Sequence, residues 1–214
     1  MSWNLYSILN NYGDFIALNS FVAPKEVLKD IEQYKDYWEK YNPNKPDIPR
    51  NSLTVTSLTG EMTNNSVSSL TEHSRTTGKS IEESDFNKPT DLYKNSKELQ
   101  NLLDPWRPFL ARTQIISLPP GGYFPPHIDG GKKQTPETFR LAMALTNTNP
   151  PGCCWMLGDD INYTALKWQY GRLYYVNTLK KHMLFNASND DSIWLIINVV
   201  TTEQSVDKVR ALIS

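Results

Sequence analysis

Seven short apolar runs in the second half of the chain constrain its fold more than any other feature. They are rich in β-branched and aromatic residues, and Gly, Pro, Asn or Asp separates each run from the next. Runs of this kind at close spacing are typical of antiparallel strands joined by tight turns, and they predict a sandwich or barrel. The predicted strands are Arg112–Leu118, Phe139–Leu145, Cys153–Leu157, Thr164–Trp168, Arg172–Asn177, His182–Asn186 and Ile193–Val200.

The rest of the chain carries helical patterns and one long polar stretch. A helix is predicted from Ala23 to Lys40, because proline suits a first turn and apolar residues then recur at helical spacing. We expect two further helices, at Ser96–Leu103 and Thr202–Ser214. Asp47–Leu92 is polar and weakly patterned, so we interpret it as either a disordered segment or a functional loop.

The length of 214 residues fits one domain with flanking segments rather than two full-size domains. We divide this domain into three parts. Residues 1–105 provide helical and loop support and a substrate lid, residues 106–200 form the β-rich core, and residues 201–214 form a C-terminal helix.

The charge and the cysteines bear on partners and compartment. The chain has 22 basic and 23 acidic residues, a balance that argues against a dominant nucleic-acid or membrane surface. Its two cysteines, Cys153 and Cys154, are adjacent and cannot form a disulfide scaffold, so we expect a reducing compartment. The N-terminus lacks the basic and apolar pattern of a signal peptide, and the expectation is a cytoplasmic protein without a membrane anchor.

Two of the three histidines carry the chemical signal. In an extended strand, residues two apart point to the same face, so His127 and Asp129 would present an imidazole and a carboxylate side by side. His182 is the one histidine downstream, on a predicted strand about fifty residues later. Two imidazoles and one carboxylate on one face of an octahedral ion form the facial triad of non-haem Fe(II) oxygenases. His73 lies in the polar stretch and is interpreted as a loop residue.

The stretch Arg112–Asp129, a strand followed by a Pro-Gly turn and a proline-rich lead-in to His-x-Asp, resembles the iron(II)/2-oxoglutarate-dependent oxygenases. It is most similar to their aspartyl/asparaginyl β-hydroxylase and free-proline hydroxylase branch, over roughly residues 106–200. The resemblance implies a mainly β fold with flanking helices around a double-stranded β-helix, or jelly-roll, core. It also implies Fe(II) held by His127, Asp129 and His182, with 2-oxoglutarate as cosubstrate. The implied reaction uses O2 to hydroxylate a C–H bond of a small polar molecule, an amino acid or a peptide side chain, and converts 2-oxoglutarate to succinate.

One position departs from the family pattern. Many members bind the far carboxylate of 2-oxoglutarate with a basic residue about ten positions after the second histidine, where this chain has Ser192. Because an unpaired buried charge is costly, another cation has to replace it. Arg140 is the first candidate, since it begins the strand after the His-x-Asp motif and shares its face with small alanines; Arg112 and Arg172 follow. Tyr123 and Ser192 are further candidate hydrogen-bond partners of the cosubstrate.

The substrate is less constrained, and two other interpretations stay open. Long loops on rigid barrels carry specificity, so Asp47–Leu92, with Arg50, Arg75 and Lys79, is the predicted lid or substrate loop. One alternative is a non-catalytic metal- or ligand-binding jelly-roll protein, which the missing basic residue favours. The other is a cupin-type metalloenzyme that does not use 2-oxoglutarate. Cupin sites usually draw on more histidines than this chain contains, which counts against it.

Overall fold

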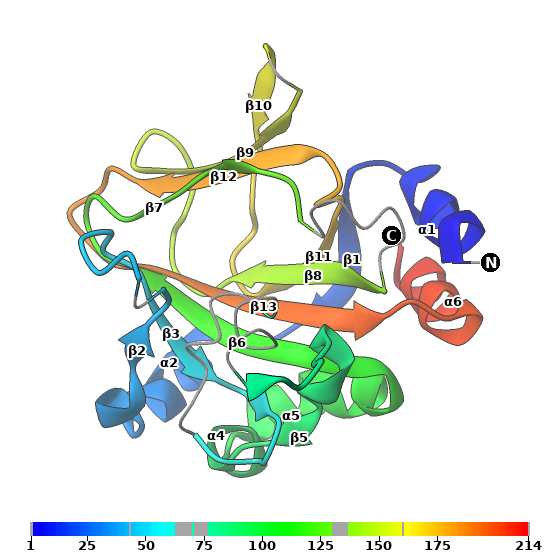
Figure 1. Cartoon of the computed structure of the whole chain (residues 1–214). Coiled ribbons are helices and arrows are strands. Elements are labelled where there is room, and N and C mark those ends of the chain that lie inside the picture. The colour runs from blue at the N-terminus through cyan, green and yellow to red at the C-terminus, as the bar shows by residue number, and fades with distance from the viewer. Residues whose placement is uncertain are drawn as a thin grey trace.

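Two antiparallel sheets face each other in the computed structural model, which describes residues 2–42, 44–62, 70, 77–129, 137–159 and 161–213 (Figure 1). The major sheet has, in spatial order, β1 (Phe15–Phe21), β11 (Arg172–Val176), β8 (Thr138–Ala144), β13 (Ser192–Val200), β6 (Leu110–Leu118), β3 (Asn51–Thr54) and β2 (Glu39–Lys40). The minor sheet has, in order, β10 (Tyr163–Ala165), β9 (Cys153–Gly158), β12 (Lys181–Asn186) and β7 (Tyr123–His127). A small ribbon pairs β4 (Thr56–Ser57) with β5 (Lys88–Pro89). The predicted class, a mainly β jelly roll with flanking helices, is confirmed.

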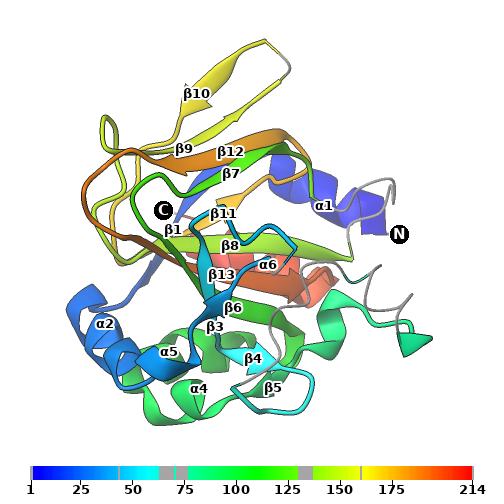
Figure 2. The same ribbon diagram turned by 60° about the vertical axis from the view of Figure 1, so that its left-hand side comes forward.

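Helices cover the face of the major sheet that points away from the minor sheet (Figures 1 and 2). Figure 2 shows α2, α4 and α5 below this sheet, and Figure 1 shows α1 and α6 next to each other at one end of it. The helices are α1 (Ser2–Asn10), α2 (Pro24–Glu32), α4 (Asp91–Asn95), α5 (Lys97–Leu103) and α6 (Glu203–Leu212), with short 3-10 turns η1 (Lys35–Tyr37), η2 (Glu83–Asp85) and η3 (Asp104–Phe109). None of the helices in these described ranges is both long enough and apolar enough to cross a lipid bilayer.

The major sheet is buried on both faces, because its strands alternate between two cores. Ile115 and Leu195 belong to the core shared with the helices, whereas Ile116 and Ile196 belong to the core between the two sheets. Successive side chains of a strand point to opposite faces, so a strand covered on both sides becomes a continuous apolar run. This explains why the central strands can be recognised in the sequence.

Three tryptophans fill much of the core between the sheets. Trp155 of β9, Trp194 of β13 and Trp168 lie with ring centroids 4.8–5.1 Å apart. All three are buried, and two of the contacts are edge-to-face, an arrangement that aromatic quadrupoles favour. The cluster extends towards the minor sheet, where the Trp155 ring lies 6.2 Å from the ring of His182.

The strand β7 is at the free edge of the minor sheet, and its sequence explains why. Pro125 and Pro126 lie within it, and proline has no backbone N–H to donate to a neighbouring strand. A strand with two consecutive prolines therefore suits an edge and not the interior of a sheet. The same prolines mask the strand in the sequence, which predicts only a turn and a lead-in before the His-x-Asp motif.

The structure differs from the sequence predictions mainly at the edges of the sheets. The helix predicted from Ala23 to Lys40 ends at Glu32, because Glu39–Lys40 pairs with β3. Part of the stretch predicted as loop or disorder is β3 itself, which pairs with β6 and buries Leu53. The predicted strand Thr164–Trp168 is shorter and begins earlier, at Tyr163–Ala165. The strand β1 has no counterpart among the predicted strands.

Gly122, in the turn between β6 and β7, gives a test of the packing. A Cβ at this position would collide with the carbonyl oxygen of Pro49, so Gly122→Ala forces two backbone segments apart. We expect it to lower the free energy of unfolding by about 1–3 kcal/mol, measured by urea denaturation. Gly121→Asn is the matched control, because Gly121 has φ +80°, open space around it and a conformation that Asn tolerates. Equal losses in both variants would contradict this explanation.

Candidate metal centre

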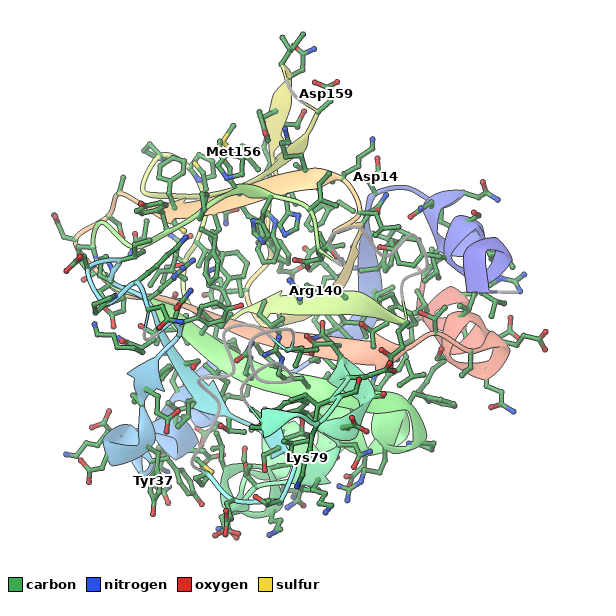
Figure 3. The ribbon with its side chains drawn as sticks, in the orientation of Figure 1. Asp14, Tyr37, Lys79, Arg140, Met156 and Asp159 are labelled. Carbon is green, nitrogen blue, oxygen red and sulfur yellow. The ribbon has the colours of Figure 1, made fainter. Side chains whose placement is uncertain are left out.

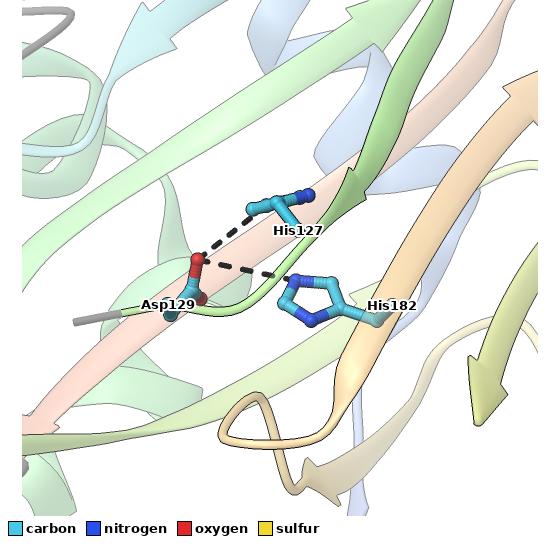
Figure 4. A group of neighbouring side chains, drawn as sticks. All are labelled: His127, Asp129 and His182. Carbon is cyan, nitrogen blue, oxygen red and sulfur yellow. Dashed lines mark ion pairs between the residues drawn. The ribbon is translucent and has the colours of Figure 1, made fainter. Parts of the chain in front are cut away.

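The antiparallel pairing of β7 with β12 brings the two distant histidines together. His127 at the end of β7 lies directly opposite His182 of β12, and their ring centroids are 4.2 Å apart. Asp129 follows two residues later, past the end of the strand rather than within it. Its backbone N–H donates to the carbonyl of Thr178 at 3.0 Å, which holds the loop beside β12. Figure 4 shows the three side chains converging from these two segments.

Hydrogen bonds to the backbone fix which nitrogen of each imidazole faces the centre. Nδ1 of His127 lies 2.7 Å from the carbonyl oxygen of Pro125, and Nδ1 of His182 lies 3.0 Å from that of Lys180. A carbonyl oxygen only accepts, so each Nδ1 carries the proton and donates it. In the neutral ring this leaves the lone pair on Nε2. Nε2 is therefore the atom that each histidine offers to a ligand.

The three atoms that face the centre, Nε2 of each histidine and Oδ1 of Asp129, are all acceptors. Oδ1 of Asp129 lies 3.4 Å from Nε2 of His127 and 3.9 Å from Nε2 of His182. All three ligand atoms lie within 4.8 Å of one another. Two lone pairs and an anionic oxygen face one another without a proton to share, an arrangement that a cation completes. The donor set of two imidazoles and one carboxylate fits a divalent first-row metal and leaves the other positions of such an ion open.

Burial and charge keep the ligands in the states that metal binding needs. Burial lowers the pKa of His182 to about 4, so this imidazole is neutral near pH 7. Burial alone would raise the pKa of Asp129, but the neighbouring Arg140 guanidinium outweighs it and holds that pKa well below its usual range. The side chain of His127 is 36% exposed, against 4% for His182, so the centre meets solvent on the His127 side.

A chain of polar side chains extends from the triad along the inner face of the major sheet. Nη1 of Arg140 binds Oδ2 of Asp129 at 2.7 Å, and its Nε and Nη2 each lie 3.3 Å from Oδ1 of Asn198. Asn198 donates to Glu83 at 3.2 Å, and Glu83 forms a two-contact ion pair with Arg112 at 2.6 and 2.8 Å. Figure 3 labels Arg140 on β8. Arg140 and Arg112, the first two candidates for binding the cosubstrate, are therefore already paired with carboxylates.

The other predicted cosubstrate residues lie elsewhere. Ser192 is buried between Nε1 of Trp194 at 2.7 Å and the Cys153 sulfur at 3.2 Å, so the tryptophan cluster occupies its surroundings. Arg172 donates to the Leu18 carbonyl at 3.0 Å, beside β1. Half-exposed Tyr123 lies at the start of β7.

Of the predicted loop residues, Lys79 is exposed, whereas His73 and Arg75 lie outside the described residues. The predicted lid stays a prediction. Its described part contributes Glu83 to the polar chain beside the triad. Sequence reasoning missed Glu83 and Asn198. A signal for Asn198 exists, since this one polar residue interrupts the apolar run of β13 on the face that carries Ile196.

Comparison with known proteins identifies the fold. No family model matches this sequence, and no curated protein matches it. A prolyl hydroxylase from Trichoplax adhaerens, in complex with a hypoxia inducible factor oxygen degradation domain peptide fragment, is 13% identical with a TM-score of 0.53, over 97% of this chain and 90% of that one. A prolyl-4-hydroxylase from Pseudomonas putida is 9% identical with a TM-score of 0.52, over 94% and 100%. An oxidoreductase of the 2OG-Fe(II) oxygenase family from Burkholderia pseudomallei matches 44% of each chain, at 14% identity and a TM-score of 0.37.

The first two matches span nearly the whole chain, and at these identities they show the fold alone. The fold is thus a double-stranded β-helix, or jelly roll, similar over nearly the whole chain to that of these two prolyl hydroxylases.

Metal binding tests the ligand set directly. We expect the protein to bind one divalent ion per chain, measured by titration calorimetry with Mn²⁺. His182→Ala and Asp129→Ala should each weaken binding by at least about 100-fold, because each removes a ligand and not merely a supporting contact. Asp159→Ala is the control, since Figure 3 shows this acidic residue at the outer end of the β9–β10 hairpin. Undiminished binding by either triad variant would refute the ligand set.

The buried imidazole also predicts a pH dependence for the metal-free protein. His182 stays neutral in the folded state down to pH about 4, whereas in the unfolded chain it takes up a proton below about pH 6.5. Its contribution to stability is therefore complete above pH 6.5 and lost as the pH falls towards 4, on the order of 3 kcal/mol. Urea unfolding with a chelator present measures this loss. His182→Asn keeps an amide donor for the Lys180 carbonyl and should decline less steeply; parallel curves would contradict the prediction.

Proposed function

We propose that the protein is an Fe(II)- and 2-oxoglutarate-dependent dioxygenase. It hydroxylates an unactivated C–H bond of a small polar molecule, an amino acid or a peptide side chain, and 2-oxoglutarate is decarboxylated to succinate. The observation that carries the proposal is the convergence of two Nε2 lone pairs and one carboxylate oxygen within 4.8 Å, in a double-stranded β-helix. His127, Asp129 and His182 hold the iron, which when bound activates O2 for the oxidation.

The residues around the triad have defined tasks in this proposal. The carbonyls of Pro125 and Lys180 orient the two imidazoles, so that Nε2 of each faces the metal. Arg140 holds Oδ2 of Asp129, which leaves Oδ1 as the metal-binding oxygen. Arg140 is therefore a positioning residue for the carboxylate. The exposed side of His127 is where the cosubstrate and the substrate approach.

The branch of the superfamily is the finer part of the proposal. The proline-rich lead-in to His127 supports the aspartyl/asparaginyl β-hydroxylase and free-proline hydroxylase branch, which acts on amino acids and side chains. The likeness in fold to two prolyl hydroxylases is compatible with a substrate of this chemical class. The near balance of charge, with a net charge of −1, argues against nucleic acid as substrate.

A spectroscopic experiment tests the cosubstrate separately from the metal. Under anaerobic conditions, the Fe(II)-loaded protein is mixed with 2-oxoglutarate, and the weak metal-to-ligand absorption band of the chelate is recorded. We expect the band in the wild-type protein and its loss in Asp129→Ala. Admission of O2 should then yield succinate, detected by mass spectrometry.

Two outcomes would change the proposal. Normal iron loading without the band would remove 2-oxoglutarate from the assignment and favour a cupin-type metalloenzyme. Absence of iron binding would favour the non-catalytic ligand-binding jelly-roll protein.

A further inference from the structure

Arg50 is a buried cation without a carboxylate partner. It immediately precedes β3, and only 6% of the residue is exposed. Its guanidinium lies 4.6 Å from the ring centroid of Phe124 and 5.2 Å from that of Tyr41, and its Nη1 donates to the Tyr123 carbonyl at 3.4 Å. In the described part of the chain, its buried Nε has no hydrogen-bond partner, and no carboxylate forms an ion pair with it.

This situation is energetically unusual. Burial lowers the pKa of Arg50, and only the two tyrosines oppose that shift. The contacts with the two aromatic rings offset part of the desolvation cost, but a buried guanidinium is stable chiefly when an anion meets it. Arg112 and Arg140 obey this rule, since each has its own carboxylate. Arg50 is more deeply buried than either of them, and among the described residues its Nε has no hydrogen-bond partner.

The strand register places Arg50 on the inner face of the sheet. Ser52 lies opposite Ile116, which belongs to the core between the two sheets, and residues two apart share a face. Arg50 and Ser52 therefore point to the same interior. The Ser52 hydroxyl is also buried, and it has no hydrogen-bond partner among the described residues. The Arg50 Nε and the Ser52 hydroxyl, two residues apart on one face, thus offer donors without a described partner to the same region.

That region adjoins the metal centre. The Phe124 ring contacts the Arg50 guanidinium, and its centroid lies 6.3 Å from that of the His127 ring. The backbone of Arg50 is fixed, because its carbonyl accepts from the Tyr41 N–H at 3.0 Å. Pro49, the residue before it, packs against Gly122 so closely that no Cβ fits there. The cation is therefore held in place before any ligand binds.

We propose that Arg50, together with Ser52, binds the carboxylate of an organic acid at the metal centre. This inference rests on the proposed function, and under it the acid is 2-oxoglutarate, whose far carboxylate pairs with the Arg50 guanidinium. Arg50 then takes the role of the basic residue that many family members have at the position of Ser192. The register supports this exchange: Ser192 pairs with Leu118, and Asn51 pairs with Ser117, so Arg50 lies in line with Leu118 and Ser192 across three strands.

A pair of ligands that differ only in the far carboxylate provides the test. 2-Oxopentanoate has the same carbon chain and 2-oxo acid group as 2-oxoglutarate but ends in a methyl group. Binding of both acids to the Fe(II)-loaded protein is measured anaerobically by titration calorimetry. We expect the wild-type protein to prefer 2-oxoglutarate by at least about tenfold, because a charge-assisted contact to the far carboxylate is worth that much or more.

Three variants separate the contributions. Arg50→Met should abolish the preference by weakening 2-oxoglutarate at least about tenfold while leaving 2-oxopentanoate and Fe(II) binding unchanged. Arg107→Met is the matched control, because Arg107 also stacks on an aromatic ring, that of Tyr93, but on the helical side of the molecule. Should Arg50→Met fail to fold, Ser52→Ala tests the same site without removing a charge, and it has to weaken 2-oxoglutarate alone.

The outcomes distinguish the two levels of the proposal. If the preference for 2-oxoglutarate persists in Arg50→Met, or in Ser52→Ala where that variant carries the test, the carboxylate assignment is wrong and the dioxygenase proposal stands. If the Fe(II)-loaded wild-type protein binds neither acid, the proposed function itself fails, and the carboxylate assignment fails with it.

Discussion

The backbone register between β7 and β12 is the constraint on which the candidate site depends. It sets His127 opposite His182, although some fifty residues separate them in the chain, and it does so at the free edge of the minor sheet. A slip of one residue would turn either imidazole to the opposite face. The tight packing of Pro49 against Gly122 and the loop bond from Asp129 to Thr178 hold the two ends of β7 in this register.

The electrostatics of the interior follow from the same framework. The inner face of the major sheet carries a polar chain from Arg112 through Glu83, Asn198 and Arg140 to Asp129, in which each guanidinium meets a carboxylate. Tryptophans fill much of the remaining interior, up to the ring of the ligand His182. Arg50 lies outside this network of polar side chains, and among the described residues it has no carboxylate partner. An external anion would supply that partner.

The sequence predicted the fold class and the central strands because these features are local. Strands such as β13 are buried on both faces and appear as continuous apolar runs. The strands at or near the edges of the major sheet were harder, because β1 and β3 are short or mixed in composition and depend on their neighbours for order. The three predicted ligands do lie together, and that they bind iron stays a proposal.

The role of Arg50 could not be predicted in the same way. In the sequence it is one of several basic residues in a polar stretch, and its isolation from carboxylates follows only from the register of β3 against β6. The converse holds for Arg140: strand alternation predicted that it faces the interior, but its ion pair with Asp129 depends on a loop beyond the strand. Pairing between distant residues is therefore the information that local patterns lack.

The two prolines of β7 have a consequence for the behaviour of the protein in solution. An exposed sheet edge is a template on which a second molecule can add a strand, and such additions begin aggregation. Pro125 and Pro126 deprive β7 of two backbone N–H groups, immediately before the ligand His127. The edge that carries the metal ligand is thus open to small molecules and a poor template for self-association.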